Sequence, residues 1–136
     1  MIRFLIVFAF TSLFVVTTTW GQNIQQQTIR WYSSNSEILP VGETLSSSCT
    51  IESSPANQTI TIDQNGRERT FSITGHDGTW TDVQSVGSIQ YDVAYDTFNG
   101  TITFLKDETG ITVLVDFSNN PAGIKRKIFI DRIVLP

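Results

Sequence analysis

The chain has 136 residues, with nine basic and thirteen acidic side chains and a net charge of −4 when its single histidine is neutral. This acidic balance speaks against a general affinity for nucleic acid or for anionic membranes, because both need a positive field. Cys49 is the only cysteine, so an internal disulfide is excluded. An unpaired cysteine is most often packed in the interior; pairing with a second chain is the next alternative, and a nucleophile is the last.

The first residues follow the pattern of a secretory signal peptide. Arg3 supplies a short positive region, and residues 4–16 form an apolar and small-residue stretch that is too short to cross a bilayer as a helix. Thr19 and Gly21 place small residues where a signal peptidase reads the chain. We therefore expect cleavage before Gln22.

Removal of residues 1–21 would leave residues 22–136, a chain of 115 residues with a net charge of −5. We expect this chain to form a single all-β domain that leaves the cytoplasm and has no membrane span. It would be extracellular, or periplasmic if the source is a Gram-negative bacterium. In a eukaryote the sequons at Asn57 and Asn99 would be candidate N-glycosylation sites.

Apolar residues recur with period two between turn signals, and no helical spacing persists over a useful length. The predicted strands cover residues 28–32, 44–51, 58–63, 68–75, 79–84, 88–97, 101–106, 111–117 and 124–133. The composition of residues 33–42 and 118–123 predicts loops there.

Two turn sequences indicate how neighbouring strands pair. The dipeptide Asn65-Gly66 is a strong signal for a two-residue hairpin loop, and it places Ile60 opposite Phe71. A four-residue loop at 107–110 ends in glycine and places Phe104 opposite Val113. Both registers bring apolar side chains onto one face of the sheet.

A second Asn-Gly dipeptide, Asn99-Gly100, is interpreted as another hairpin loop, which places Tyr95 opposite Phe104. Residues 88–117 then form a three-stranded meander with a continuous apolar face. One such sheet cannot bury that face alone. The predicted fold class is therefore all-β, an antiparallel meander that forms a β-sandwich or a small barrel.

No constellation typical of an enzyme is recognisable in the sequence. The only histidine, His76, lies in the glycine-flanked segment 74–78, which predicts a turn. It is interpreted as a solvated turn residue, with a ligand contact or an acid–base group as the alternatives. One histidine and one cysteine exclude a zinc site built on clustered residues of these types. We expect no catalytic residues, metal site or cofactor.

The aromatic residues Trp31, Tyr32 and Trp80 are the main candidates for ligand binding, together with His76. Trp31 and Tyr32 are adjacent, so on a strand they point to opposite faces, and one of them is expected to be partly exposed. An exposed ring could stack on a sugar or anchor a partner, whereas a core ring would only pack. We therefore hypothesise that Trp31 or Trp80 contacts a ligand.

The segment Lys125-Arg126-Lys127 is the only basic cluster. It is suited to a phosphate, a sulfate or an acidic polysaccharide. Alternatively, lysines on an Ile-rich edge strand would discourage aggregation between sheets.

Export, an all-β frame, several aromatic residues and the lack of a catalytic constellation favour a secreted, non-catalytic binding module. Its partner would be an unknown ligand or protein outside the cell: a glycan, a small apolar molecule or another protein. A structural or adhesive surface component is the first alternative, and a small hydrolytic enzyme is the second. The sequence favours a binding role without excluding an enzyme.

Overall fold

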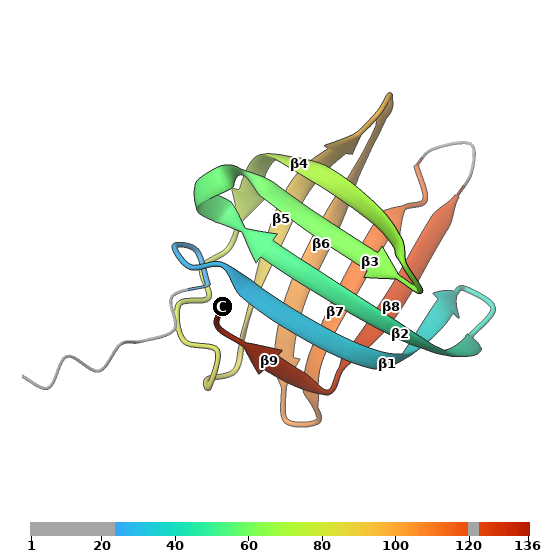
Figure 1. The fold of residues 1–136 in the computed structure, drawn as a ribbon, viewed down its shortest axis with the longest axis horizontal. Coiled ribbons are helices and arrows are strands. Elements are labelled where there is room, and N and C mark those ends of the chain that lie inside the picture. The colour runs from blue at the N-terminus through green and yellow to red at the C-terminus, as the bar shows by residue number, and fades with distance from the viewer. Residues whose placement is uncertain (1–23, 120–122) are drawn as a thin grey trace, which may run out of the picture.

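The computed structural model describes residues 24–119 and 123–136 (Figure 1). Within these ranges it contains one short 3-10 helix and nine strands, whose bounds follow. The elements are β1 (Ile29–Leu39), β2 (Glu43–Ser54), η1 (Pro55–Asn57), β3 (Thr59–Gln64), β4 (Arg67–Asp77), β5 (Gly87–Tyr95), β6 (Phe98–Asp107), β7 (Gly110–Phe117), β8 (Ile124–Ile130) and β9 (Arg132–Val134). The predicted signal peptide lies outside the described residues.

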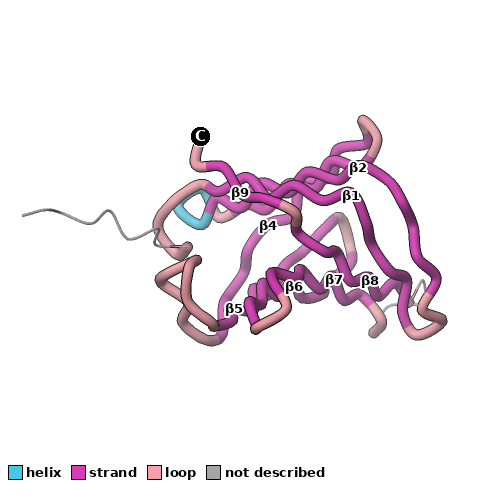
Figure 2. Tube along the Cα trace, turned by 90° about the horizontal axis from the view of Figure 1, so that it is seen from below, coloured by secondary structure: helices cyan, strands magenta, loops and turns pink. Residues whose placement is uncertain are grey.

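The strands form a closed antiparallel barrel. Each strand from β1 to β7 pairs with the next along the chain, and β8 pairs with β1, which closes the ring. The short strand β9 pairs with the beginning of β1 as an additional strand. Of the two arrangements expected from the sequence, the structure is the barrel. Figure 2 shows β5 to β8 as one wall of the barrel, with β1, β2, β4 and β9 opposite.

The inner face of the barrel is filled by alternate side chains of the strands, as expected for eight strands. Aromatic rings occupy its middle: Trp31 lies 4.8 Å from Phe104 and 6.1 Å from Trp80 between ring centroids. The most deeply buried aliphatic side chains around them are Ile24, Ile29, Ile51, Ile60, Ile89, Val93, Ile102, Val113 and Ile128.

The two ends of the barrel differ. At the covered end, residues 24–28 and the β4–β5 loop (78–86) lie against the barrel (Figure 1). Ile24, Trp80 and Val83 from these two segments are buried in the core. The described connections at the open end include the short β1–β2 turn and the β3–β4 turn at Asn65-Gly66.

The strand registers predicted from the Asn65-Gly66 turn and from the turn at residues 107–110 are confirmed. Ile60 pairs with Phe71 across the β3–β4 hairpin. Phe104 pairs with Val113 across β6 and β7. Asn65 and Gly66 have φ of 53° and 84°, the left-handed values that this hairpin loop demands.

The prediction of a hairpin loop at Asn99-Gly100 is wrong. The β5–β6 turn falls three residues earlier, with Tyr95 opposite Phe98 and Tyr91 opposite Ile102. Gly100 lies within β6, where a Cβ would come 2.5 Å from the Asp116 carbonyl oxygen and 2.6 Å from the ring of Phe117. The glycine is therefore required by close packing. The predicted apolar face survives, because the register changes by an even number of residues.

Three further boundaries differ from the prediction. Residues 33–39, expected as a loop, continue β1 and contain a bulge between Ser33 and Asn35. Residues 79–84, expected as a strand, belong to the β4–β5 loop. The predicted strand 124–133 is divided at Asp131 into β8 and β9, which pair with different parts of β1.

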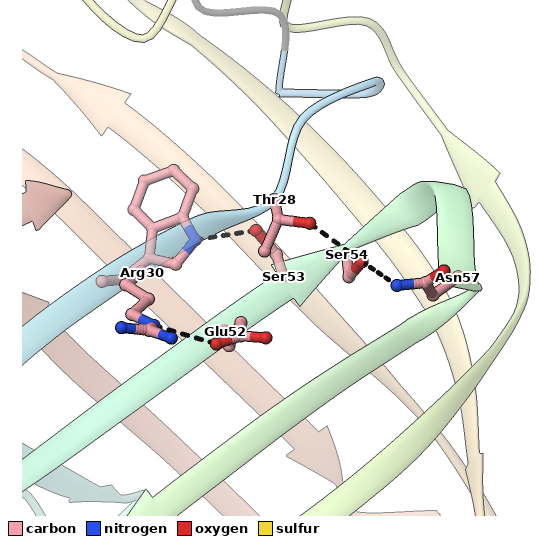
Figure 3. Close-up of polar contacts among 7 residues, drawn as sticks. Thr28, Arg30, Glu52, Ser53, Ser54 and Asn57 are labelled. Atoms are coloured by element: carbon pink, nitrogen blue, oxygen red, sulfur yellow. Dashed lines mark hydrogen bonds and ion pairs between the residues drawn. The ribbon is translucent and has the colours of Figure 1, made fainter. Parts of the chain in front are cut away.

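Polar contacts hold the covered-end parts of β1 and β2 together (Figure 3). Arg30 Nε lies 3.0 Å from Glu52 Oε2 on the outer surface. Ser54 Oγ lies 3.1 Å from the hydroxyl of Thr28 and accepts a hydrogen bond from Asn57 Nδ2 at 3.0 Å. These contacts connect the strand pair to η1. Among the described residues, none of the helical structure is long and apolar enough to cross a membrane.

Candidate functional site: a basic cavity at the open end

A cavity of about 660 Å³ lies at the open end of the barrel. Its apolar lining comes from Ile38, Leu39, Leu45, Ile62, Phe71, Val115, Ile124 and Ile128. Its polar and charged lining comes from Gln64, Asn65, Arg67, Arg69, Lys125 and Arg126. The cavity thus combines apolar walls with cationic groups.

The charge of this lining is opposite to that of the whole chain. Four of the eight basic residues in the described part of the chain line the cavity, and none of the thirteen acidic residues of the sequence is in its described lining. Lys125 is partly neutralised, because its Nζ lies 3.8 Å from Asp116 Oδ2. The three arginines therefore dominate the electrostatics of the cavity.

Arg126 enters the barrel because it lies on the inner face of β8. It pairs with Val115, whereas its neighbours Lys125 and Lys127 pair with Asp116 and Leu114 on the other face. The Arg126 guanidinium donates to Ser36 Oγ from Nε at 3.0 Å and from Nη2 at 2.7 Å. Nη1 donates to Gln64 Oε1.

Both hydrogen-bond partners of Arg126 are neutral. In the described part of the chain no carboxylate lies within ion-pair distance of this guanidinium. Burial lowers the pKa of Arg126, since a half-buried charge loses hydration that its neutral neighbours restore only in part. An anion bound in the cavity would supply the missing counter-charge.

Arg67 and Arg69 extend the basic lining along β4. They pair with Gln64 and Ile62, so they continue the inner row that contains Phe71. Within the described residues neither side chain makes a hydrogen bond or an ion pair. Two guanidinium groups at the open end are therefore available to a ligand.

A second, smaller cavity of about 370 Å³ lies at the covered end. It contains the candidate residue His76, which the structure places in β4 rather than in the predicted turn. A bulge between Ile73 and Gly75 shifts the pairing, so that His76 lies opposite Tyr91. The side chain of His76 remains exposed.

Trp31 and Trp80 are core residues, with 0% and 2% of their surface exposed. Trp31 Nε1 donates to Ser53 Oγ at 2.8 Å, and Trp80 Nε1 donates to the Ser85 carbonyl oxygen at 2.9 Å. Neither ring belongs to the described lining of either cavity. Both rings therefore pack in the core, which was the alternative to a ligand contact that the sequence left open.

Of the other residues singled out in the sequence, Tyr32, Asn57 and Asn99 lie on the surface, whereas Cys49 is buried. Tyr32 is half-buried on the outside of the barrel, where the Arg132 guanidinium lies 4.1 Å from its ring centroid. The side chains of both sequon asparagines, Asn57 and Asn99, are exposed. Cys49 is a free, buried thiol, and burial raises its pKa.

The basic cluster of the sequence is divided between the two faces of β8. This strand pairs with β7 on one side and β1 on the other, so its lysines do not protect a free sheet edge. Arg67 and Arg69 line the cavity but were not among the site residues predicted from the sequence. The period-two pattern of the strand would have predicted their position, because it places both arginines on the apolar face of the hairpin, in the row Arg67, Arg69, Phe71 and Ile73.

Groups of three or more histidine, cysteine, aspartate or glutamate side chains that could hold a metal ion are not found in the described part of the chain. No family model matches the chain, and neither a curated protein nor a solved structure does so.

Proposed function

We propose that this protein is a secreted, non-catalytic binding protein that holds a small amphipathic anion at the open end of its barrel. The observation that carries the proposal is the lining of the 660 Å³ cavity, where an acidic chain concentrates arginines among apolar walls. The apolar part of the ligand would pack against side chains such as Phe71 and Ile62. Its anionic group would reach Arg126, Arg69 or Arg67.

The dimensions and chemistry of the cavity suit such a ligand. Small-molecule sites are commonly about 300–1,000 Å³ in volume, with mostly apolar walls and a few fixed polar groups. An arginine guanidinium offers paired N–H donors that match a carboxylate. Secretion of the protein is supported by the N-terminal sequence pattern alone.

The other ligand classes raised from the sequence have less support. A neutral glycan or an uncharged apolar molecule would leave the cationic groups of the cavity without a counter-charge. A structural role or hydrolysis would not require arginines to face inward. In particular, Cys49 pairs with Gln64, whereas His76 pairs with Tyr91, so the register does not join them as a nucleophile and a base.

Binding can be tested by calorimetry with three ligands that share a twelve-carbon chain: dodecanoate, dodecyltrimethylammonium and dodecyl maltoside. We expect saturable binding of dodecanoate alone, below its critical micelle concentration. Loss of one hydrogen bond to a charged group corresponds to about 1.5–3 kcal/mol of binding free energy. Arg126→Gln should therefore lower the affinity for dodecanoate about tenfold or more.

Two variants make the test specific. Arg69→Gln removes an exposed cavity charge that has no partner in the described structure, so it should weaken binding without destabilising the barrel. Lys127→Gln removes the same charge from the outer face of β8 and should leave the affinity unchanged. Equal binding of the cationic amphiphile, or equal losses in all three variants, would refute the proposal.

A further inference from the structure

We propose that the covered-end cavity is a second binding site, which takes an uncharged small molecule whose carbonyl or hydroxyl oxygen accepts a hydrogen bond from Tyr91. This inference concerns the opposite end of the barrel and does not depend on the anion proposed for the open end. It rests on the position of Tyr91, the bulge in β4 and the charge of the lining.

Tyr91 is one of the residues that line this cavity, and its hydroxyl group is a buried hydrogen-bond donor. The residue lines the cavity and is only 3% exposed. Its hydroxyl group is buried and has no hydrogen-bond partner among the residues that the structure describes. Burial raises the pKa of Tyr91 to about 12, so the hydroxyl group keeps its proton at neutral pH. A buried tyrosine hydroxyl normally has a partner, and leaving it unpaired is costly.

The bulge in β4 brings a second polar side chain to the same place. Strict alternation from Ile73 would turn His76 to the outside of the barrel. The extra residue, Thr74, restores His76 to the inner row, directly opposite Tyr91. Bulges re-aim side chains in this way next to functional sites. The lining of this cavity thus combines an exposed imidazole with a buried phenol.

The rest of the described lining indicates the class of ligand. Gln25 and Gln58 contribute amides, Ile73 and Ile89 contribute apolar surface, and no acidic or basic side chain other than the imidazole belongs to it. A volume of about 370 Å³ has room for a ligand of on the order of ten non-hydrogen atoms. The cavity therefore fits a compact neutral molecule with both apolar and hydrogen-bonding parts.

The core separates this cavity from the arginines of the open end. The Tyr91 ring packs edge-on against Phe104 at 5.9 Å, and Phe104 packs against Trp31 at 4.8 Å. The two cavities have no lining residue in common. Ligands at the two ends can therefore be distinguished by charge.

The test uses three five-membered ring compounds and the NMR signals of the His76 ring, which are unambiguous because the chain has one histidine. The probes are neutral 2-pyrrolidone, cationic pyrrolidinium and anionic cyclopentanecarboxylate. We expect 2-pyrrolidone to shift the His76 signals saturably and more tightly than the charged rings. Tyr91→Phe should weaken its binding about three- to tenfold, as for one neutral hydrogen bond.

Tyr95→Phe is the matched control, because Tyr95 lies on the same strand and in the described lining of neither cavity. It should leave the titration of His76 unchanged. Three results would overturn the inference: no saturable shift, an undiminished affinity in Tyr91→Phe, or a crystal soaked in 2-pyrrolidone that shows only water at the Tyr91 hydroxyl. None of them would affect the dodecanoate experiment, which measures the other end of the barrel.

Discussion

Replacement of Trp31 by phenylalanine tests whether this indole is a structural element of the core. The change removes the N–H that donates to Ser53 Oγ at 2.8 Å, in a place where both residues have 0% exposure. An unpaired buried hydroxyl costs about 1–3 kcal/mol. The loss of about 40 Å³ of side-chain volume adds about 1 kcal/mol at the usual cost of a cavity. We expect Trp31→Phe to lower the free energy of unfolding by about 2–4 kcal/mol.

The assay is urea denaturation followed by far-ultraviolet circular dichroism, which does not depend on indole fluorescence. Ser53→Ala alone leaves the Trp31 N–H unpaired and should also destabilise the barrel. The double variant should be more stable than the sum of the two single effects predicts, by about 1 kcal/mol or more, because it removes both partners. The reasoning fails if Trp31→Phe unfolds at the wild-type urea midpoint, or if the two effects are additive. The affinity for dodecanoate should stay the same, since Trp31 is not in the described lining of the open-end cavity.

Two further predictions concern β6 and β7. Gly100→Ala should destabilise the protein by about 1–3 kcal/mol through overpacking against the Asp116 carbonyl oxygen, and unchanged stability in urea would contradict the register that we describe. For Asp116, hydrogen bonds from the Ser118 side chain and backbone, with a smaller contribution from Lys125, hold the pKa below its ordinary value of 3.8. The charged carboxylate therefore stabilises the fold above that pH, and the stabilisation is lost as the pH falls through the lowered pKa. Thermal denaturation should show that Asp116→Asn is less stable than wild type at pH 7 and that the difference narrows below pH 3.8, whereas a constant difference would exclude this linkage.

Local turn chemistry made much of the β-meander predictable. The Asn65-Gly66 dipeptide fixed the register of β3 and β4, because few other sequences adopt two successive left-handed residues. The same rule misplaced the β5–β6 turn. In that turn Asp96, with φ of 54°, adopts the left-handed conformation. Gly100 is needed for a different reason: in the folded sheet the ring of Phe117 lies too close to leave room for a Cβ.

The polar inner residues explain why the open-end site was hard to predict. The segment 33–39 has the composition of a loop, yet Ser33 and Ser36 are buried on the inner face of β1. A sequence rule that assigns polar residues to the outside fails where a barrel places polar groups within it. From the sequence, Arg126 could be identified only as part of a basic cluster. That its side chain points into the barrel follows from the pairing of β8 with β7.

Ring closure has a consequence for the order of folding. Most neighbouring strands are joined by short connections and can pair early. The pairing of β1 with β8 is instead a long-range contact, since Ser36 and Arg126 are separated by 90 positions in the sequence. These two residues meet across the closing seam. We therefore expect the capacity to bind an anion to be acquired at a late kinetic step, after most β-structure has formed. In a stopped-flow refolding experiment, a fluorescent anionic amphiphile would then report closure of the ring separately from formation of the hairpins.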